Sequence, residues 1–151
     1  MTHLLYILRC HGGKYYVGKT NRYIGDRLQE HFDGTGSAWT RLHSPDHLIR
    51  TIPDPESWDE DKYTKLYMQR YGIHNVRGGA YIQVELDSRL VYALKRELRS
   101  AHDACFRCGG LGHFQNRCCQ PDPFESDHEP DLDPNESDHT NDCQWWWDGI
   151  L

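Results

Sequence analysis

Four side chains of the kinds that bind zinc stand close together late in the sequence. They lie in the run CFRCGGLGHFQNRC, which has the spacing C-x2-C-x4-H-x4-C, and they are Cys105, Cys108, His113 and Cys118. Three thiolates and one imidazole complete a tetrahedral zinc shell. A run of 14 residues buries too little apolar surface to fold without such a metal, and its three glycines permit the tight backbone that a metal loop needs. The spacing therefore predicts a structural Zn2+ site at residues 105–118.

The six cysteines also raise the alternative of disulfide bonds in a secreted protein. Residues 1–8 argue against it, because polar and charged residues follow them directly and no apolar signal-peptide core is seen. We therefore expect a reducing, intracellular setting, the nucleus or the cytoplasm, where closely spaced Cys and His are metal ligands. The remaining cysteines have no predicted role: Cys10, Cys119 and Cys143.

A second group of side chains could act on a phosphodiester: Tyr6, Tyr16, Arg27 and His31. The two tyrosines fall on segments that we expect to pair as a hairpin, while Arg27 and His31 are four residues apart on one helix face. Hydrolysis of a phosphodiester needs a proton acceptor for the attacking water, a cation for the phosphate and usually a divalent metal. Singly, these residues could be hairpin aromatics and a solvated helix face. Together they favour an active site.

The elements that would position this group form a mixed α/β pattern. Strand-like segments at residues 3–10 and 15–18 flank a Gly-containing turn, and a third at residues 47–52 lies between two prolines. Helical periodicity covers residues 24–32, 56–71 and 88–101. In the second of these helices we expect the buried face to consist of Tyr63, Leu66, Tyr67 and Tyr71.

The 151 residues suffice for one ordinary domain with small appendages, and no apolar stretch is long enough to span a membrane. The net charge of -6 hides an asymmetry, because residues 1–119 carry 17 basic and 13 acidic side chains, a net +4, whereas the rest carries 10 acidic ones. A basic body suits a polyanionic partner, and the acidic segment could compete with that partner.

We expect a catalytic domain at 1–87, a connecting helix at 88–104, the zinc site at 105–118 and a disordered acidic tail at 119–151.

Three motifs, taken in order, resemble the GIY-YIG nuclease domain of homing endonucleases, some restriction enzymes and a bacterial excision-repair nuclease. They are LLYIL with Tyr6, KYYVGKT with Tyr16 and Gly18, and DRLQEHF with Arg27 and His31. The resemblance covers residues 3–95. It includes GIHNVRGG at residues 72–79, where Asn75 matches the family's asparagine; NVRGG and the segment GSAWT at 36–40 look like a branch from large DNA viruses and mobile elements.

The resemblance implies an α+β fold with a small sheet of three antiparallel strands flanked by helices. It implies that one tyrosine helps to activate water, that Arg27 neutralises the phosphate and that His31 positions the reacting groups. An acidic residue of the second long helix would hold one Mg2+ ion. Lys19, directly after the second motif, would bind phosphate or assist as a base, and Asn75 would bind phosphate.

Two positions depart from the family pattern. Leu4 and Leu5 precede Tyr6 where the first motif has its glycine, which a strand residue can replace. Thr64 stands where the metal-binding glutamate is expected, and a hydroxyl is a poor ligand for Mg2+. Glu60, one helical turn earlier on the same face, is the candidate ligand, and its rivals are Asp59, Asp61 and Glu56.

The run at residues 105–118 resembles the zinc knuckle of retroviral nucleocapsids and of many nucleic-acid-binding proteins, including the pair Gly112 and His113. This resemblance implies single-stranded RNA or DNA as a ligand. Phe106 and Phe114 would then offer stacking surfaces for unpaired bases.

These features predict a metal-dependent endonuclease that hydrolyses DNA, with Mg2+ at its active site and a CCHC zinc knuckle that holds nucleic acid. In the alternative, the missing glutamate has inactivated the domain and left a nucleic-acid-binding protein with the same fold. A third possibility is an adaptor that works through its acidic tail and terminal tryptophans. No membrane partner is expected.

Overall fold

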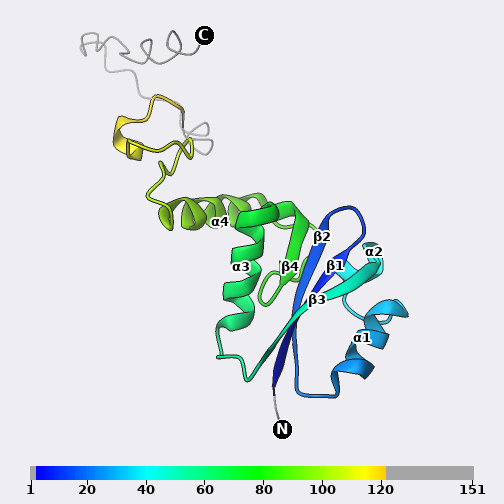
Figure 1. Ribbon diagram of the computed structural model, residues 1–151. Helices are drawn as coiled ribbons and strands as arrows, with labels where there is room; N and C mark the ends of the chain where they lie inside the picture. Colours follow the sequence, from blue (N-terminus) through cyan, green and yellow to red (C-terminus); the bar gives the residue numbers. More distant parts are fainter. Residues whose placement is uncertain (1–2, 122–151) are drawn as a thin grey trace, which may run out of the picture. The chain divides into compact units, whose positions relative to one another are not determined.

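The computed structural model describes residues 3–121, which form two compact units: residues 3–98 and residues 99–121. Figure 1 shows the ribbon. The first unit holds the strands β1 (Leu4–Cys10), β2 (Lys14–Thr20), β3 (Pro45–Pro53) and β4 (Val76–Gly78) and the helices α1 (Ile24–Phe32), α2 (Ala38–Leu42) and α3 (Asp59–Tyr71). Helix α4 (Ser88–Ser100) lies mostly in this unit. Short 3-10 turns occur at Ile73–Asn75 and Gln115–Arg117.

The sheet has four strands in the order β3-β1-β2-β4. Strand β1 pairs antiparallel with β2 and with β3, and Tyr6 lies opposite Gly18. Gly12 and Gly13 both have positive φ, the conformation that a tight hairpin turn requires. The mixed α+β class and the hairpin are as expected, but the expectation of three antiparallel strands is wrong by one strand. The fourth, β4, is parallel to β2; it has only three residues, all buried, so its sequence shows no alternation that could reveal it.

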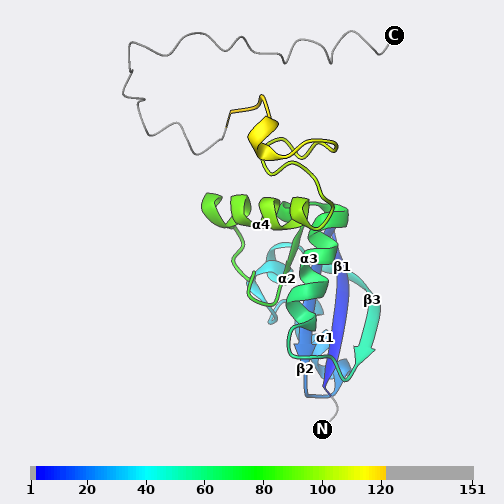
Figure 2. The same ribbon diagram turned by 90° about the vertical axis from the view of Figure 1, so that its left-hand side faces the viewer.

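Helices cover both faces of this sheet, as Figures 1 and 2 show for α3 on one side and α1 and α2 on the other. On the α1/α2 face, Tyr6, Leu8, Tyr16 and Trp39 form one buried cluster. The indole of Trp39 donates to the main-chain oxygen of Tyr15 at 2.9 Å and so fastens α2 to the sheet. On the α3 face the buried residues are Leu5, Ile7 and Val17, with Tyr15, Met68, Val76, Val91 and Leu94 beside them.

The helices agree with the expected ones to within a few residues, except that α2 was not expected. The buried face of α3 differs from the prediction. Its fully buried residues are Thr64 and Met68, whereas Leu66 is 48% exposed and the tyrosines are half-buried at the flanks. A small residue at 64 lets the helix approach the sheet closely, because a Cβ added to Gly78 would lie only 2.7 Å from the Thr64 hydroxyl.

Arg77 stabilises the segment that follows α3. Its side chain is 2% exposed, and it donates to the main-chain oxygens of Ile73, Val76, Gln83 and Val84 at 2.6 to 2.9 Å. The guanidinium also lies 4.5 Å from the ring centroid of Trp39. Arg77 thereby fixes the loop that carries Gly78 and Gly79 next to the N-terminal half of α3.

Within residues 3–121, no helix is long and apolar enough to cross a membrane. The expected disordered tail falls almost wholly on residues 122–151, which lie outside the described part of the chain.

Candidate active site and candidate metal centre

Tyr6 reaches across the hairpin and lies on the backbone of Gly18. A Cβ added at position 18 would come within 2.5 Å of the Tyr6 hydroxyl and 2.9 Å of the Tyr16 ring. Any larger residue would therefore displace both phenols. The glycine of the second motif is required here because two tyrosine rings occupy the space where its side chain would be.

Hydrogen bonds connect Tyr6 to α1 and α2. Arg27 Nε donates to the Tyr6 hydroxyl at 3.0 Å, that hydroxyl lies 2.9 Å from His31 Nε2, and His31 Nδ1 lies 2.8 Å from Thr40 Oγ1. Thr40 Oγ1 in turn donates to the main-chain oxygen of Ser37 at 3.1 Å. Tyr6 and His31 are fully buried, so the phenol proton must have an acceptor, and His31 Nε2 is the one within reach among the described residues. His31 is then neutral with its proton on Nδ1.

The electrostatic environment of His31 agrees with that tautomer. Burial, together with the nearby charge of Arg27, lowers the pKa of His31 to about 4. The imidazole is therefore uncharged near neutral pH and can accept the Tyr6 proton. Gly36 leaves room for it, because a side chain there would overlap Nδ1 of His31.

Tyr16 completes the aromatic group. Its ring centroid lies 5.0 Å from that of His31 and 6.3 Å from that of Tyr6. Burial raises the pKa of Tyr16, and the charge of Arg27 and the side chain of Ser37 oppose this rise. Burial raises the pKa of Tyr6 as well. Both phenols are thus protonated at neutral pH, and Tyr16, at 7% exposure, is the one of the two that solvent can touch.

Arg27 is the partly accessible cation of the site, with 23% of its side chain exposed. Its Nη1 pairs with a carboxylate oxygen of Glu30 at 2.5 Å, and Arg22 pairs with the same carboxylate at 2.8 Å. Hydrogen bonds from Arg22 and Arg27 lower the pKa of Glu30 to about 2. Glu30 therefore stays ionised and holds Arg27 from one side while Tyr6 holds it from the other.

Glu60 of α3 is a half-buried carboxylate near the end of β2. Burial raises its pKa, whereas the charge of Lys19 and the main-chain N–H groups of Gly79 and Lys19 lower it. The charge of Glu60 also raises the pKa of both Tyr6 and Tyr16. The half-buried Glu60 carboxylate thus lies at the end of β2, near the exposed Lys19 and close enough to act on both phenols.

The rival acids of α3 are engaged elsewhere. Asp61 accepts from the main-chain N–H of Ala80 at 2.8 Å, and Asp59 accepts from that of Glu56 at 2.9 Å and faces Lys62 at 3.5 Å. Glu56 itself is exposed before the helix begins. Asp59 thus stabilises the start of α3 and Asp61 the loop after β4, whereas Glu60 is the acid of this helix whose charge acts on both phenols.

Two further predicted residues lie apart from the tyrosine pair. Thr64 is fully buried and donates its hydroxyl to the main-chain oxygen of Glu60 at 2.7 Å. Asn75 accepts from Lys14 Nζ and donates to the main-chain oxygen of Tyr71, both at 2.7 Å, so its amide caps α3. The structure therefore gathers Tyr6, Tyr16, Arg27 and His31 on the α1/α2 face, places Glu60 near Lys19 at the end of β2, and leaves Asn75 with Lys14.

Sequence reasoning missed the residues that support this group. Glu30 and Thr40 contact Arg27 and His31 directly, and Ser37 caps α2 by accepting from the main-chain N–H of Thr40 at 3.2 Å. The signal was present in GSAWT, because serine is a preferred residue at the N-cap of a helix. Nothing in that segment alone would have shown that Thr40 points to His31.

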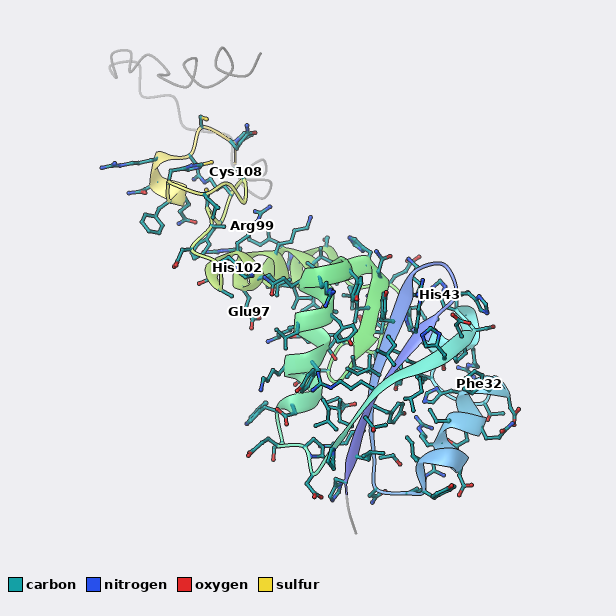
Figure 3. The ribbon with its side chains drawn as sticks, viewed as in Figure 1. Phe32, His43, Glu97, Arg99, His102 and Cys108 are labelled. Atoms are coloured by element: carbon teal, nitrogen blue, oxygen red, sulfur yellow. The ribbon has the colours of Figure 1, made fainter. Side chains whose placement is uncertain are left out.

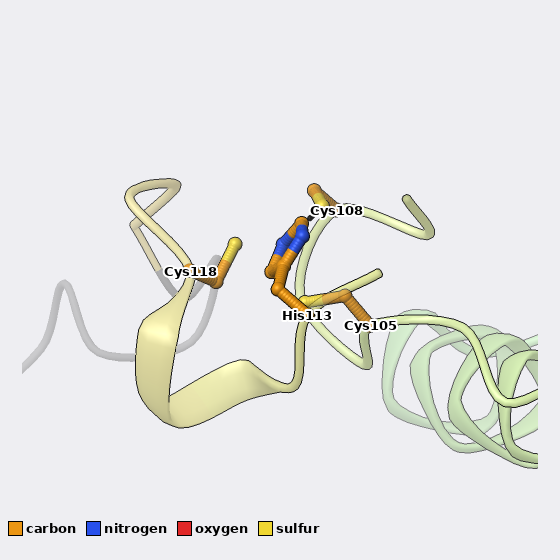
Figure 4. A group of neighbouring side chains, drawn as sticks. All are labelled: Cys105, Cys108, His113 and Cys118. Carbon is orange, nitrogen blue, oxygen red and sulfur yellow. Dashed lines mark hydrogen bonds between the residues drawn. The ribbon is translucent and has the colours of Figure 1, made fainter. Parts of the chain in front are cut away.

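The second unit holds the Cys and His cluster. Figure 4 shows the side chains of Cys105, Cys108, His113 and Cys118 pointing toward one another. Their ligand atoms all lie within 4.8 Å of one another, and Nε2 of His113 is 3.3 Å from the sulfur of Cys108. Zn–S and Zn–N bonds of about 2.3 and 2.1 Å place tetrahedral ligands at comparable separations. The four residues thus fit one zinc ion.

Main-chain N–H groups near this cluster favour the thiolate form of Cys105. Burial would raise the pKa of Cys105, but main-chain N–H groups of Cys108 and Arg107 and the neighbouring thiols lower it to about 6. Gly109 and Gly112 have positive φ, and the main-chain N–H of Gly110 donates to the Cys108 sulfur at 3.3 Å.

Arg99, which Figure 3 labels beside Cys108, donates to the main-chain oxygens of Phe106 and Arg107 at 2.6 and 2.7 Å.

Of the two predicted stacking residues, Phe114 is 70% exposed, whereas Phe106 is half-buried. Phe114 is thus the one whose ring is open to an unpaired base.

Comparison with known proteins shows what most of the first unit is similar to. Residues 2–72 match the GIY-YIG catalytic domain, which confirms that part of the expected resemblance. The Cys and His cluster lies beyond the matched residues. No solved structure gives a significant match.

The relatives found are bacterial UPF0213 proteins, a name that states no activity. One from Xanthomonas axonopodis pv. citri (strain 306) is 40% identical over 52 residues, which is 34% of this chain and 50% of the relative. One from Halalkalibacterium halodurans is 29% identical over 86 residues, or 54% of this chain and 90% of the relative. One from Bacillus cereus (strain ATCC 10987) is 33% identical over 69 residues, which is 46% of this chain and 66% of the relative. The chain spans about half the length of the Xanthomonas relative.

Proposed function

We propose that the protein is a metal-dependent endonuclease that hydrolyses phosphodiester bonds of DNA, with a C-terminal zinc knuckle that binds nucleic acid. The observation that carries this proposal is the convergence of Arg27, His31 and the two phenols on one face of the β1–β2 hairpin, with the charge of Glu60 acting on both phenols. The match of residues 2–72 to the GIY-YIG catalytic domain supports a nuclease.

The two tyrosines have different roles in this proposal. Tyr16 is at the surface of the group and meets the attacking water, which it orients through its hydroxyl. Tyr6 is fully buried and acts through its neighbours: with His31 behind it, it holds Nε of Arg27 so that the guanidinium faces the phosphate. Arg27 then stabilises the charge that accumulates on the phosphate oxygens.

Glu60 would hold the Mg2+ ion. Magnesium in phosphodiester chemistry is usually bound by one or two carboxylates, with waters and substrate phosphate oxygens completing its shell. A single half-buried carboxylate whose charge acts on both phenols fits that pattern. When bound, the metal would lower the pKa of a coordinated water and neutralise phosphate charge, while Lys19 beside Glu60 offers a further cation for the substrate.

The zinc knuckle would hold the substrate near the catalytic unit. Phe114 would stack on an unpaired base, and Cys105, Cys108, His113 and Cys118 would hold a closed structural zinc shell with no open position for catalysis. Thiolate ligands need a reducing compartment, and we accordingly propose that the protein acts inside a cell, on DNA or on single-stranded nucleic acid.

A nicking assay tests the enzyme. Supercoiled plasmid, single-stranded DNA and RNA are incubated with the protein in Mg2+ or Mn2+, and products are resolved on gels. We expect cleavage of DNA that falls at least about 100-fold in Arg27→Ala, Tyr16→Phe and Glu60→Gln. Asp59→Asn is the matched control, because Asp59 lies one residue from Glu60 and contacts Glu56 and Lys62 instead.

The same assay addresses the inactive alternative. A protein that binds nucleic acid but cuts none of these substrates in either metal would contradict the endonuclease. Full activity in Glu60→Gln together with loss in Asp59→Asn would leave the endonuclease in place but move the metal to a different carboxylate.

A further inference from the structure

A groove of about 450 Å³ opens on the α1/α2 side of the first unit. Its polar lining comes from the start of β2, the end of α2 and the segment around β4, and it includes Lys14, His43, His74, Arg77 and Glu85. Trp39 forms its aromatic wall. Figure 3 shows His43 beside the β1–β2 hairpin, whose His11 N–H donates to the main-chain oxygen of Ser44 at 2.9 Å. None of the groups assigned to hydrolysis lines this groove.

The groove is positively charged. Arg77 is buried there and bonds only to main-chain oxygens, and no carboxylate of residues 3–121 comes within ion-pair distance of it. Lys14 Nζ uses one donor on Asn75 and retains two more. Burial lowers the pKa of His43, and the charges of Lys14 and Arg77 lower it further, which shows that both cations act on the groove. Glu85, an exposed residue, is the one carboxylate among its lining residues.

The position of Lys14 relates the groove to the candidate active site. Lys14 and Tyr16 are two residues apart on β2, so they lie on the same face of the sheet at roughly 7 Å along the strand. That separation is about the distance between successive phosphates of one nucleic-acid strand. A strand whose scissile phosphate lies at Arg27 and Tyr16 would bring its next phosphate to Lys14.

The walls suit a nucleotide rather than a bare anion. His43 packs edge-on against Trp39 with ring centroids 4.4 Å apart, and Leu42, Val84 and Leu86 supply apolar surface. A cavity of this size is within the range of small-ligand sites. Cations on one side and aromatic and apolar groups on the other match the phosphate and the sugar with its base.

We propose that this groove binds the nucleotide next to the one that is cut, with its phosphate on Lys14 and in the field of Arg77. The imidazole groups of His43 and His74 are further hydrogen-bonding groups for that nucleotide. This inference rests on the proposed nuclease function and adds to it the path of the substrate strand beyond the scissile phosphate.

Binding is measured in a full-length Glu60→Gln background, where the DNA stays intact, by fluorescence anisotropy of a short single-stranded DNA over a range of salt. We expect Lys14→Met to weaken binding about 5- to 10-fold and to reduce the slope of log K against log salt by about 0.7, the value for one lost phosphate contact. Lys14→Arg should restore both quantities. Lys95→Met, an exposed lysine of α4, is the control and should change neither.

Glu85→Gln supplies an outcome that a folding defect cannot produce. Removing the only carboxylate among the groove's lining residues should tighten binding about 2- to 3-fold. The proposal would be overturned if the Glu60→Gln protein bound DNA with the same affinity and salt slope whether or not it also carried Lys14→Met or Glu85→Gln. So would imidazole NMR shifts of His43 and His74 that respond to inorganic phosphate and ignore a dinucleotide.

The two proposals fail separately. If Lys14→Met leaves the salt slope unchanged while wild-type protein still cuts DNA, the groove proposal alone is rejected. A protein that never cuts but shows the predicted responses of Lys14 and Glu85 rejects the nuclease and supports the groove.

Discussion

The hydroxyl of Thr64 donates to the main-chain oxygen of Glu60 at 2.7 Å, one turn earlier on α3. The two residues therefore share a helix face but point to different surroundings. Thr64 is fully buried against the backbone of Gly78, whereas the half-buried Glu60 carboxylate lies near Lys19 and the main-chain N–H groups of Lys19 and Gly79. The departure from the family pattern at position 64 thus concerns a packing position, and a carboxylate is present one turn away.

Substitutions of Thr64 should change stability rather than catalysis. Thr64→Val removes one hydroxyl from a buried site and should keep DNA cleavage within about 3-fold, at a cost of about 1 kcal/mol in the free energy of unfolding. Thr64→Glu should not create or increase cleavage, because it buries a charge without a partner and should cost about 3 kcal/mol or more. Urea denaturation and the nicking assay measure both effects. Higher cleavage in Thr64→Glu would show that position 64 reaches the metal.

Gly18 should be more sensitive to substitution than any surface glycine. In Gly18→Ala the added methyl group overlaps the Tyr6 hydroxyl, so we expect a loss of about 1 to 3 kcal/mol in the free energy of unfolding and a large fall in cleavage. Gly25→Ala is the matched control. Its methyl group meets only the ring of Tyr23, which is 74% exposed and can move, and alanine is the better helix former. Equal stability of the two variants would contradict the contact between Tyr6 and Gly18.

The hairpin and the long helices could be predicted from periodicity and turn residues, and the proximity of Tyr6, Arg27 and His31 from motif order. The fourth strand could not, because three buried residues carry no period and parallel pairing joins them to a distant segment. Arg77 was hidden for a related reason. A buried arginine whose partners are all main-chain oxygens leaves no trace in side-chain identities.

The choice among the acids of α3 could be made only in part from the sequence. Asp59, Glu60 and Asp61 are adjacent, and the helical spacing from Thr64 favours Glu60 without excluding the other two. In the structure the charge of Glu60 acts on Tyr6 and Tyr16, whereas Asp59 contacts the start of α3 and Asp61 the loop after β4. Only three-dimensional placement shows which acid of the helix lies near the tyrosines.

His31 should make the protein less stable in mild acid. Its pKa is about 4 in the folded protein and about 6.5 in the unfolded chain, so between these values the unfolded chain binds more protons. The free energy of unfolding must then fall as pH is lowered from 6.5 toward 4, by roughly 3 kcal/mol over the full window. Urea denaturation at pH 7, 6 and 5 measures this slope.

The comparison is best made in a Glu60→Gln background. The pKa of Glu60 is raised in the folded protein, so its protonation increases the free energy of unfolding as pH falls, opposite to the effect of His31. His31→Gln can still accept from Tyr6 and donate to Thr40, and it should flatten the slope. His43→Gln should flatten it only slightly, since His43 is less buried than His31. An unchanged slope in His31→Gln would mean that another group controls the acid response.

The acidic segment should weaken nucleic-acid binding at low salt. Residues 1–119 carry a net +4 and the remainder carries 10 acidic side chains, so the segment competes electrostatically with a polyanion. Truncation after residue 121 should raise affinity for single-stranded DNA about 3-fold or more at 50 mM salt, and the gain should shrink as salt rises. Identical affinity at every salt concentration would exclude competition. Loss of localisation without any change in affinity would instead favour the adaptor role.

Zinc should be held by four residues and not by the cysteine next to them. Cys118 belongs to the cluster, whereas the adjacent Cys119 is exposed and lies outside it. Purified protein should contain one zinc ion per chain by elemental analysis. Cys118→Ser should lower zinc affinity by at least about 100-fold, since losing even an outer-shell partner costs 10- to 100-fold, and Cys119→Ser should bind zinc like the wild type. Chelation should change the NMR signals of residues 99–121, because their fold depends on the metal, and should leave those of the buried core around Tyr6 and Trp39 in place. Equal zinc loss in both variants would contradict the CCHC assignment.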